Sequence, residues 1–361
     1  MSAVSMARSD EGSSAQAFVH AAGPSDPATP LPQHLSETGL FVPGTPAKIR
    51  PGNLSFSPQY ALWSDGAAKR RWLYLPPGTS IDAARPNAWE FPLGTRLWKE
   101  FSHNGRPVET RFIERVADGS WRFAAYVWNE DGSDATLAPA TGIRALPARE
   151  APNGTYAIPS QSDCRACHEG AAAPVLGVST LQLSPDRDPL APHAERPQEN
   201  DVDLRGLVAR GLLRNLPPQL LDRAPRIATA SPTERAALGY LHANCGHCHN
   251  NLANETDAEA TTVPVDLLLG QDVTAPLRSV ETVLRSMVNA PSRYRAPGLP
   301  EDTPLITPGQ HDHSVLVARM RTRNPNAQMP PLGTKLPDAE GLALIERWIN
   351  NDLQPRKEPQ P

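Results

Sequence analysis

All four cysteines of this 361-residue chain belong to two copies of one pattern, Cys-x-x-Cys-His. Two thiols at this spacing can form thioether bonds to the vinyl groups of one haem, and the adjacent histidine can then bind the iron. The pattern therefore predicts two covalently attached haem c groups, each with one histidine iron ligand. The residues are Cys164, Cys167 and His168 in the first copy, and Cys245, Cys248 and His249 in the second.

Zinc binding, a redox dithiol and coincidence are the alternatives for such cysteine pairs. Histidine is 10 of 361 residues, so a histidine after both pairs by chance has odds of roughly one in a thousand. In a zinc ribbon, the two cysteine pairs are separated by about 15–20 residues. Here the whole segment 168–244 separates the two pairs. A thioredoxin-like dithiol is not expected twice. Haem is the favoured interpretation at both sites.

The bulk composition is that of a globular protein, with 39% hydrophobic and 20% charged residues. The net charge is −4 and no basic stripe is present, so nucleic acid is not an expected partner. No apolar run approaches the length of a membrane span, and we expect none. The length allows two or three domains.

The chain divides into four predicted parts. Residues 1–34 are rich in Ser, Ala, Asp, Gly and Pro, which predicts a disordered N-terminal arm. The expected fold class is multidomain α+β, with an N-terminal antiparallel β sandwich or barrel-like domain before mainly α-helical cytochrome c-type segments. The remaining parts are 35–150 as the tryptophan-rich β domain, 151–230 as the first haem segment and 231–361 as the second haem domain.

Strand patterns in the β part carry six of the seven tryptophans. The segments 108–116 and 121–128 flank Asp118-Gly119, a turn signal that predicts a hairpin. The tryptophans are expected to fill the core, with a ligand-binding platform as the alternative.

Met329 is the candidate upper iron ligand of the second haem. It lies in the sequence Gln-Met-Pro-Pro, which is too polar and too constrained for an ordinary core position. A core role for Met329, or ligation by Met320 instead, are the alternatives. His247 and His242 are expected to be neighbours of the iron site rather than ligands.

Residues 231–353 resemble a class I cytochrome c domain. Ser231 caps a predicted helix that runs into Cys245, and Asp338 caps a predicted helix from residue 339 to 352. A further helix is predicted at 315–321, and the segment 255–310 reads as an insertion. The resemblance implies that His249 and Met329 bind iron from opposite sides. It also implies that the first and last helices cross, with Gly239 or Tyr240 near Trp348.

The upper ligand of the first haem is left open by the sequence. His193, His103, His34 and Met287 are candidates, and each is more often a surface or core residue than a ligand. An iron with an open or water-bound position is the further alternative, and such a position is where oxygen or peroxide chemistry occurs.

From about residue 35 the whole chain resembles an uncharacterised bacterial family of dihaem c-type cytochromes. The matching stretches include residues 35–41, 62–67, 98–101, 109–111 and 125–129. The resemblance implies one architecture of β domain plus two haem segments, and it implies no particular substrate.

The favoured function is electron transfer between redox partner proteins through two haems, with the β part docking a partner. A dihaem peroxidase or oxidase with an open first iron is the alternative, and a zinc-stabilised binding module is the third possibility. Haem attachment of this kind is completed outside the bacterial cytoplasm, so we expect a periplasmic or otherwise exported protein. The first thirty residues nevertheless lack the apolar core of a signal peptide.

Overall fold

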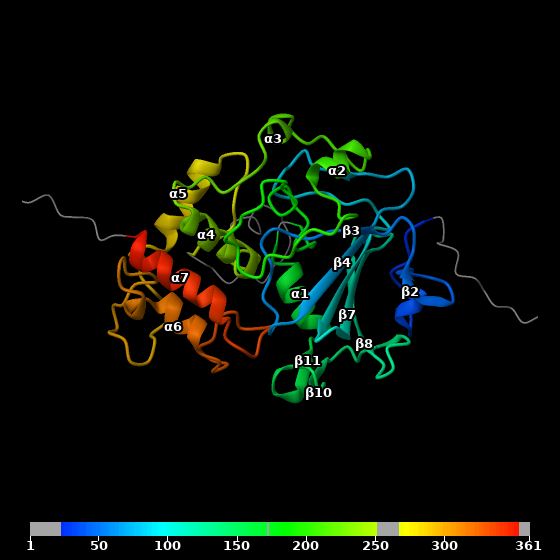
Figure 1. Cartoon of the computed structure of the whole chain (residues 1–361), viewed down its shortest axis with the longest axis horizontal. Coiled ribbons are helices and arrows are strands. Elements are labelled where there is room, and N and C mark those ends of the chain that lie inside the picture. Colours follow the sequence, from blue (N-terminus) through cyan, green and yellow to red (C-terminus); the bar gives the residue numbers. More distant parts are fainter. Residues whose placement is uncertain (1–22, 172, 251–266, 354–361) are drawn as a thin grey trace, which may run out of the picture.

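The computed structural model describes residues 23–171, 173–250 and 267–353. It is a mixed α/β structure, with an antiparallel sheet in the N-terminal half and most of the helices after it (Figure 1). The expected order of a β part followed by helical segments is therefore confirmed. The sheet has six strands in the order β3-β4-β6-β7-β8-β9. Its strands are β3 (Leu54–Ser55), β4 (Ala68–Tyr74), β6 (Arg96–His103), β7 (Arg106–Arg115), β8 (Trp121–Trp128) and β9 (Ala135–Leu137).

The hairpin predicted around Asp118-Gly119 joins β7 to β8, with Glu109 opposite Val127 and Arg115 opposite Trp121. Gly119 has φ 88°, a conformation that glycine adopts without steric cost. Strands β3 and β9 are the edges, so the sheet is open. The expected sandwich or barrel was wrong in this respect, because the sheets described beside it have two strands each. They are β1 (Phe41–Val42) with β2 (Thr45–Ile49), β5 (Ile81–Asp82) with β12 (Leu213–Arg214), and β10 (Ile143–Pro147) with β11 (Thr155–Ile158).

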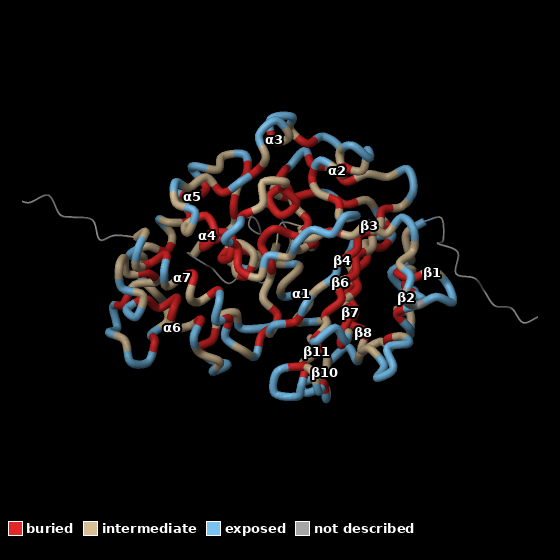
Figure 2. Tube along the Cα trace, in the orientation of Figure 1, coloured by how far each residue is buried: buried red, intermediate tan, exposed pale blue. Residues whose placement is uncertain are grey.

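Both faces of the central sheet are covered, and Figure 2 shows its strands as mainly buried. Alternation along each strand sends one set of apolar side chains to each face. Trp72, Trp98 and Tyr126 on one face pack in a cluster with Leu35 and Leu40 of the N-terminal segment. The other face contributes Leu73, Leu97, Ile113 and Phe123 to the largest core cluster of the molecule.

Seven α-helices are found in the described ranges. They are α1 (Gln161–His168), α2 (Leu204–Ala209), α3 (Gln219–Asp222), α4 (Pro232–Asn244), α5 (Pro276–Met287), α6 (Val315–Arg321) and α7 (Ala339–Asn351). The Ser231 hydroxyl accepts a hydrogen bond from the Glu234 amide, and the Asp338 carboxylate accepts one from the Gly341 amide. Both predicted helix caps are therefore confirmed.

Helices α4 and α7 pack against each other, as the sequence led us to expect. The contact residues differ from the expectation. A Cβ atom at Gly341 would lie 2.4 Å from the Tyr240 ring, so the missing side chain of Gly341 is what lets Tyr240 approach. Gly239 instead faces Tyr60 of the β part, where a Cβ atom would lie 2.0 Å from the ring. The Trp348 indole donates to Glu234 at 3.3 Å.

The largest core cluster does not divide along the predicted segment boundaries. It includes Ile113 of the sheet, Leu181 of the middle segment, and Leu238 and Trp348 of the last segment. The N-terminal arm also joins the sheet from residue 23 onward: the Ser25 hydroxyl donates to Glu114, and the Pro32 carbonyl accepts from the Tyr126 hydroxyl. Residues 1–22 lie outside the described ranges. No helix among the described residues is both long enough and apolar enough to span a bilayer.

Candidate functional site

The first cysteine pair lies on helix α1, which packs against strand β8 of the sheet. A capping box starts the helix: the Ser160 hydroxyl accepts from the Asp163 amide at 3.1 Å, and the Asp163 carboxylate accepts from the Ser160 amide at 2.9 Å. One helical turn then presents Cys164, Cys167 and His168 in sequence.

The His168 ring is held as an iron-binding histidine needs to be. Its Nδ1 lies 2.6 Å from the Pro174 carbonyl oxygen, so Nδ1 carries the proton and Nε2 keeps its free lone pair. Phe123 of β8 packs on the ring, with 5.2 Å between centroids. Burial lowers the pKa of His168 to about 4, so the imidazole is neutral at neutral pH. Burial likewise raises the pKa of the Cys164 and Cys167 thiols to about 11.

The second cysteine pair follows helix α4 directly. The Cys245 amide donates to the Leu241 carbonyl, and the His249 amide donates to the Cys245 carbonyl at 2.9 Å. Gly246 is required between them, because a Cβ atom there would lie 2.5 Å from the His242 carbonyl oxygen. Burial and the Arg319 guanidinium lower the pKa of His249.

Met329 is connected to the surroundings of His249 through Arg319 of helix α6. The Met329 amide donates to the Arg319 carbonyl at 3.0 Å. The positive charge of the Arg319 guanidinium lowers the pKa of His249. Met320, the rival ligand, packs in the main core cluster. No distance between Met329 and His249 is established by these contacts, so ligation by Met329 stays a prediction.

The two Cys-x-x-Cys-His motifs lie against each other. The Cys248 sulfur is 4.0 Å from the carbonyl oxygen of Ala166, which lies between the two cysteines of the first motif. The Asn250 amide group donates to the Gly170 carbonyl at 3.1 Å and to the His247 carbonyl at 3.0 Å. Two segments about eighty positions apart in the sequence therefore form one composite site.

A cavity of about 150 Å³ opens beside the first motif, and its mouth is open to solvent. Cys167 and His168 form part of its wall, and the sheet face that carries Leu97 and Ile113 forms another. The loop 58–64, the end of α4 and the segment 332–334 after Met329 complete it.

None of the four candidate upper ligands is among the described residues that line this cavity. Both His193 nitrogens face carboxylates, Asp338 at 2.8 Å and Glu340 at 3.4 Å. His103 packs edge-on against Tyr156, and Met287 is fully buried in the core. His34 is exposed, beside the bridge that it forms with residue 136.

His247 lies in the wall of the cavity beside the first motif, a position that its place in the second motif does not predict. Its Nδ1 is buried and has no hydrogen-bond partner in the described part of the chain. Burial lowers its pKa to about 4. His242 is similarly neutral, with its pKa lowered by burial to about 4, and its Nδ1 accepts a hydrogen bond from the Gln271 amide at 3.3 Å.

Four cations that sequence reasoning missed lie on the sheet face toward this cavity. Their positions alternate along neighbouring strands, with Arg71 opposite Lys99 and Lys99 opposite Arg111. In the sequence of β4 the charged residues follow one another on both faces of the strand, so the alternation of these cations is not apparent from the sequence. We call Lys69, Arg71, Lys99 and Arg111 the basic row.

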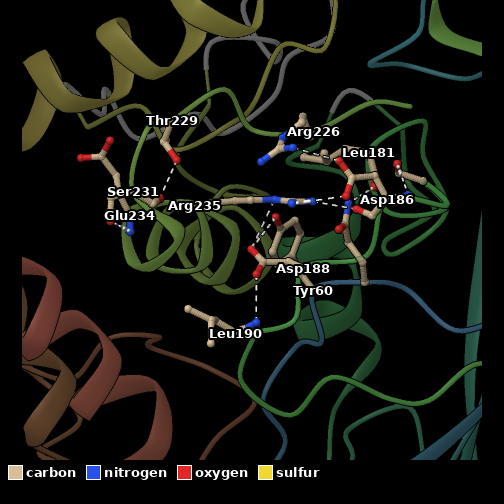
Figure 3. A network of polar contacts seen from close by, with 12 residues as sticks. Tyr60, Leu181, Asp186, Asp188, Leu190, Arg226, Thr229, Ser231, Glu234 and Arg235 are labelled. Atoms are coloured by element: carbon tan, nitrogen blue, oxygen red, sulfur yellow. Dashed lines mark hydrogen bonds and ion pairs between the residues drawn. The ribbon is translucent and has the colours of Figure 1, made fainter. Parts of the chain in front are cut away.

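A polar network fixes the helix that carries the second motif (Figure 3). Arg235 of α4 is buried, and its guanidinium donates to the Asp186 carbonyl at 2.7 Å and faces the Asp188 carboxylate at 3.5 Å. Asp188 also accepts from the hydroxyl of Tyr60, which lines the cavity, at 3.1 Å. Burial and Asp188 raise the pKa of Tyr60, so its hydroxyl stays a donor. The network thereby joins α4 to the cavity wall.

The donor set of the first motif is the one that covalent haem attachment requires. The described residues include all four cysteines, and they contain no cluster of three or more His, Cys, Asp or Glu side chains that could hold a metal ion. A c-type haem site needs two thiols and one neutral histidine, and the first motif supplies these donors beside the cavity. Comparisons with protein-family models, with curated proteins and with solved structures give no match to this chain.

Proposed function

We propose that this chain is an exported dihaem c-type cytochrome that transfers electrons between redox partner proteins. The contact between the two motifs carries the proposal. Thioether bonds attach the edge of a haem to its cysteines, and the Cys248 sulfur lies 4.0 Å from the backbone between Cys164 and Cys167. Haems attached at both motifs would therefore approach each other by their edges, which suits electron exchange.

Haem supplies reversible one-electron chemistry when it is bound. The residues of this chain would hold it and adjust its potential. The four cysteines would attach the two haems, and His168 and His249 would bind the irons as neutral imidazoles. The Pro174 carbonyl makes the His168 ring more basic, which favours ferric iron at the first site. A thioether ligand from Met329 would favour ferrous iron at the second site.

The order of elements in the C-terminal part supports the same proposal. Helix α4, the second motif, the Met329 loop and helix α7 follow one another, with α4 and α7 in contact. This is the order expected of a class I cytochrome c domain. Cytochrome-like haem segments at 151–230 and 231–361 are accordingly part of the proposal.

A second candidate function is a haem peroxidase or oxidase reaction at the first site. The cavity favours it, because no methionine and no histidine other than His168 and His247 is found among the described residues of its wall. An iron held by His168 alone would keep a position for an external ligand, and the second haem would deliver electrons to it.

Absorption spectra with and without carbon monoxide separate these functions. The protein should be exported by a bacterial host that matures c-type haem, then measured oxidised, reduced, and reduced with carbon monoxide. We expect two low-spin haems whose spectra do not change when carbon monoxide is added. After rapid mixing with a limiting amount of reductant, we expect the electrons to be shared between the two haems. Capture of one haem by carbon monoxide would favour the second function. Protein without covalent haem would contradict both.

A further inference from the structure

The basic row occupies the middle of the sheet face that forms one wall of the first cavity. Arg71 on β4, Lys99 on β6 and Arg111 on β7 are directly opposite one another across three strands, and all three line the cavity. Lys69 lies two positions before Arg71 and so on the same face of β4. Like charges directly opposite each other destabilise a sheet, so this arrangement needs a compensating anion.

The protein compensates only half of this charge. Glu195 forms a two-pronged ion pair with Arg71, and Glu109 pairs with Arg111 at 2.8 and 3.1 Å. Lys69 and Lys99 have no carboxylate partner in the part of the chain that the structure describes. With Lys69 and Lys99 protonated, the row and its two glutamates therefore have an excess of two positive charges.

Three cations and one carboxylate, Glu195, act on Lys99, so positive charge dominates its surroundings. Its ammonium lies 5.0 Å from the centre of the Phe101 ring, and Arg111 lies over the same ring at 4.4 Å. Burial, together with Arg71, Lys69 and Arg111, lowers the pKa of Lys99 well below its usual range. A buried charge without a partner is costly, which favours binding of an anionic group here.

The same wall is apolar next to the first motif. Ile113 and Phe123 lie side by side on β7 and β8, and Phe123 packs on His168. Arg111 follows on the same face of β7, two positions from Ile113. The wall thus offers an apolar surface beside the iron-binding histidine and positive charge beyond it. A flat ligand with an apolar body and two carboxylates at one edge fits this pattern.

We propose that the basic row binds the two propionate carboxylates of the haem attached at Cys164 and Cys167. The central sheet is then one wall of the first haem site rather than a separate docking module. Two propionates would balance the two excess charges of the row. This inference rests on the proposed function, because it requires haem at the first motif.

Reduction potentials of row variants test the inference. Lys99→Met removes one charge and keeps the length of the side chain, and Lys99→Arg restores the charge. Lys69→Met is a second removal at the other unpaired cation. Lys48→Met is the matched control, because Lys48 is an exposed lysine on β2, outside the cavity. Each variant is purified as the two-haem protein, haem is counted, and both midpoint potentials are measured with and without millimolar succinate.

We expect Lys99→Met and Lys69→Met each to lower one of the two potentials, because a nearby cation stabilises ferrous over ferric haem. Lys99→Arg should restore the wild-type value, and Lys48→Met should change neither potential. Unchanged potentials in both removal variants, with two haems present, would overturn the propionate assignment alone. A succinate response that disappears with Lys99→Met would assign the row to a free anion instead, and would also overturn it. Wild-type protein without haem would overturn the proposed function itself.

Discussion

The two histidines that we propose as iron ligands differ in how the second nitrogen of each ring is held. His168 donates from Nδ1 to the Pro174 carbonyl at 2.6 Å, whereas the buried Nδ1 of His249 has no close hydrogen bond within the described ranges, and the ring has only a weaker backbone interaction with Leu267. A donated Nδ1 proton makes an imidazole a stronger ligand for ferric iron. The first haem should therefore have the lower reduction potential, and the second haem should be the one that is reduced first.

Replacement of Met329 by leucine tests this difference at the second site. Methionine ligation raises the potential of a haem, so Met329→Leu should lower one midpoint potential and abolish the absorption band of sulfur-to-iron charge transfer. Potentiometric titration and visible spectra measure both. Met320→Leu is the control, because Met320 packs in the core and its loss should leave both properties intact. The opposite pattern would assign the ligand to Met320.

His242 should make the protein sensitive to acid. Burial lowers the pKa of His242 from 6.5 to about 4. Between these pH values the unfolded chain therefore binds a proton at His242 and the folded chain does not. The contribution of His242 to the free energy of unfolding is complete above pH 6.5 and falls by about 3 kcal/mol as the pH is lowered to 4. Denaturant unfolding of the wild type and of His242→Gln between pH 7 and 4 measures this. An equal pH dependence in both proteins would contradict it.

At the scale of elements, the helix caps and turns were readable from the sequence, while the long-range pairing was not. Ser231 and Asp338 mark the starts of α4 and α7 by local chemistry, and Asp118-Gly119 marks a hairpin. The sheet order and the open edges depend on register between distant strands, which a local pattern does not encode. The contact between the two motifs is equally non-local, because loops and short elements separate them.

The Arg235 network shows what holds α4 in place, and its loss should weaken that element. Arg235→Met leaves the Asp188 carboxylate, whose side chain is 1% exposed, without its cation. Removal of one partner from a buried ion pair costs about 3 kcal/mol, and urea unfolding measures it. Arg226→Met is the matched control, because Arg226 is about half exposed and pairs with Asp186 at 3.5 Å. Its loss should cost less than about 1 kcal/mol. Equal costs for the two variants would contradict the role of the network.

At the scale of the whole molecule, one core cluster joins the sheet, the middle segment and the C-terminal helices. The composition of the chain suggested separable domains, because tryptophan-rich strands and capped helices occupy different stretches of sequence. Packing between them involves residues such as Tyr60 against Gly239, a fit that appears only in three dimensions. The sheet and the helices are therefore expected to depend on each other.

This dependence predicts a single cooperative unfolding transition. Tryptophan fluorescence reports mainly on the β part, which holds six of the seven tryptophans, and far-ultraviolet circular dichroism reports mainly on the helices. The two signals should give the same urea midpoint, because one shared core unfolds as a unit. A fluorescence transition well separated from the circular dichroism transition would show that the two parts fold independently.

The most direct test of two covalent haems is the intact mass of the exported chain and of two paired variants. Cys164→Ala with Cys167→Ala removes the first attachment site, and Cys245→Ala with Cys248→Ala removes the second. The wild type should carry the added mass of two haems, retained in denaturing acid, and each paired variant should carry one. A wild-type chain with the unmodified mass of its sequence, made in a host that attaches haem to a control cytochrome, would contradict the account.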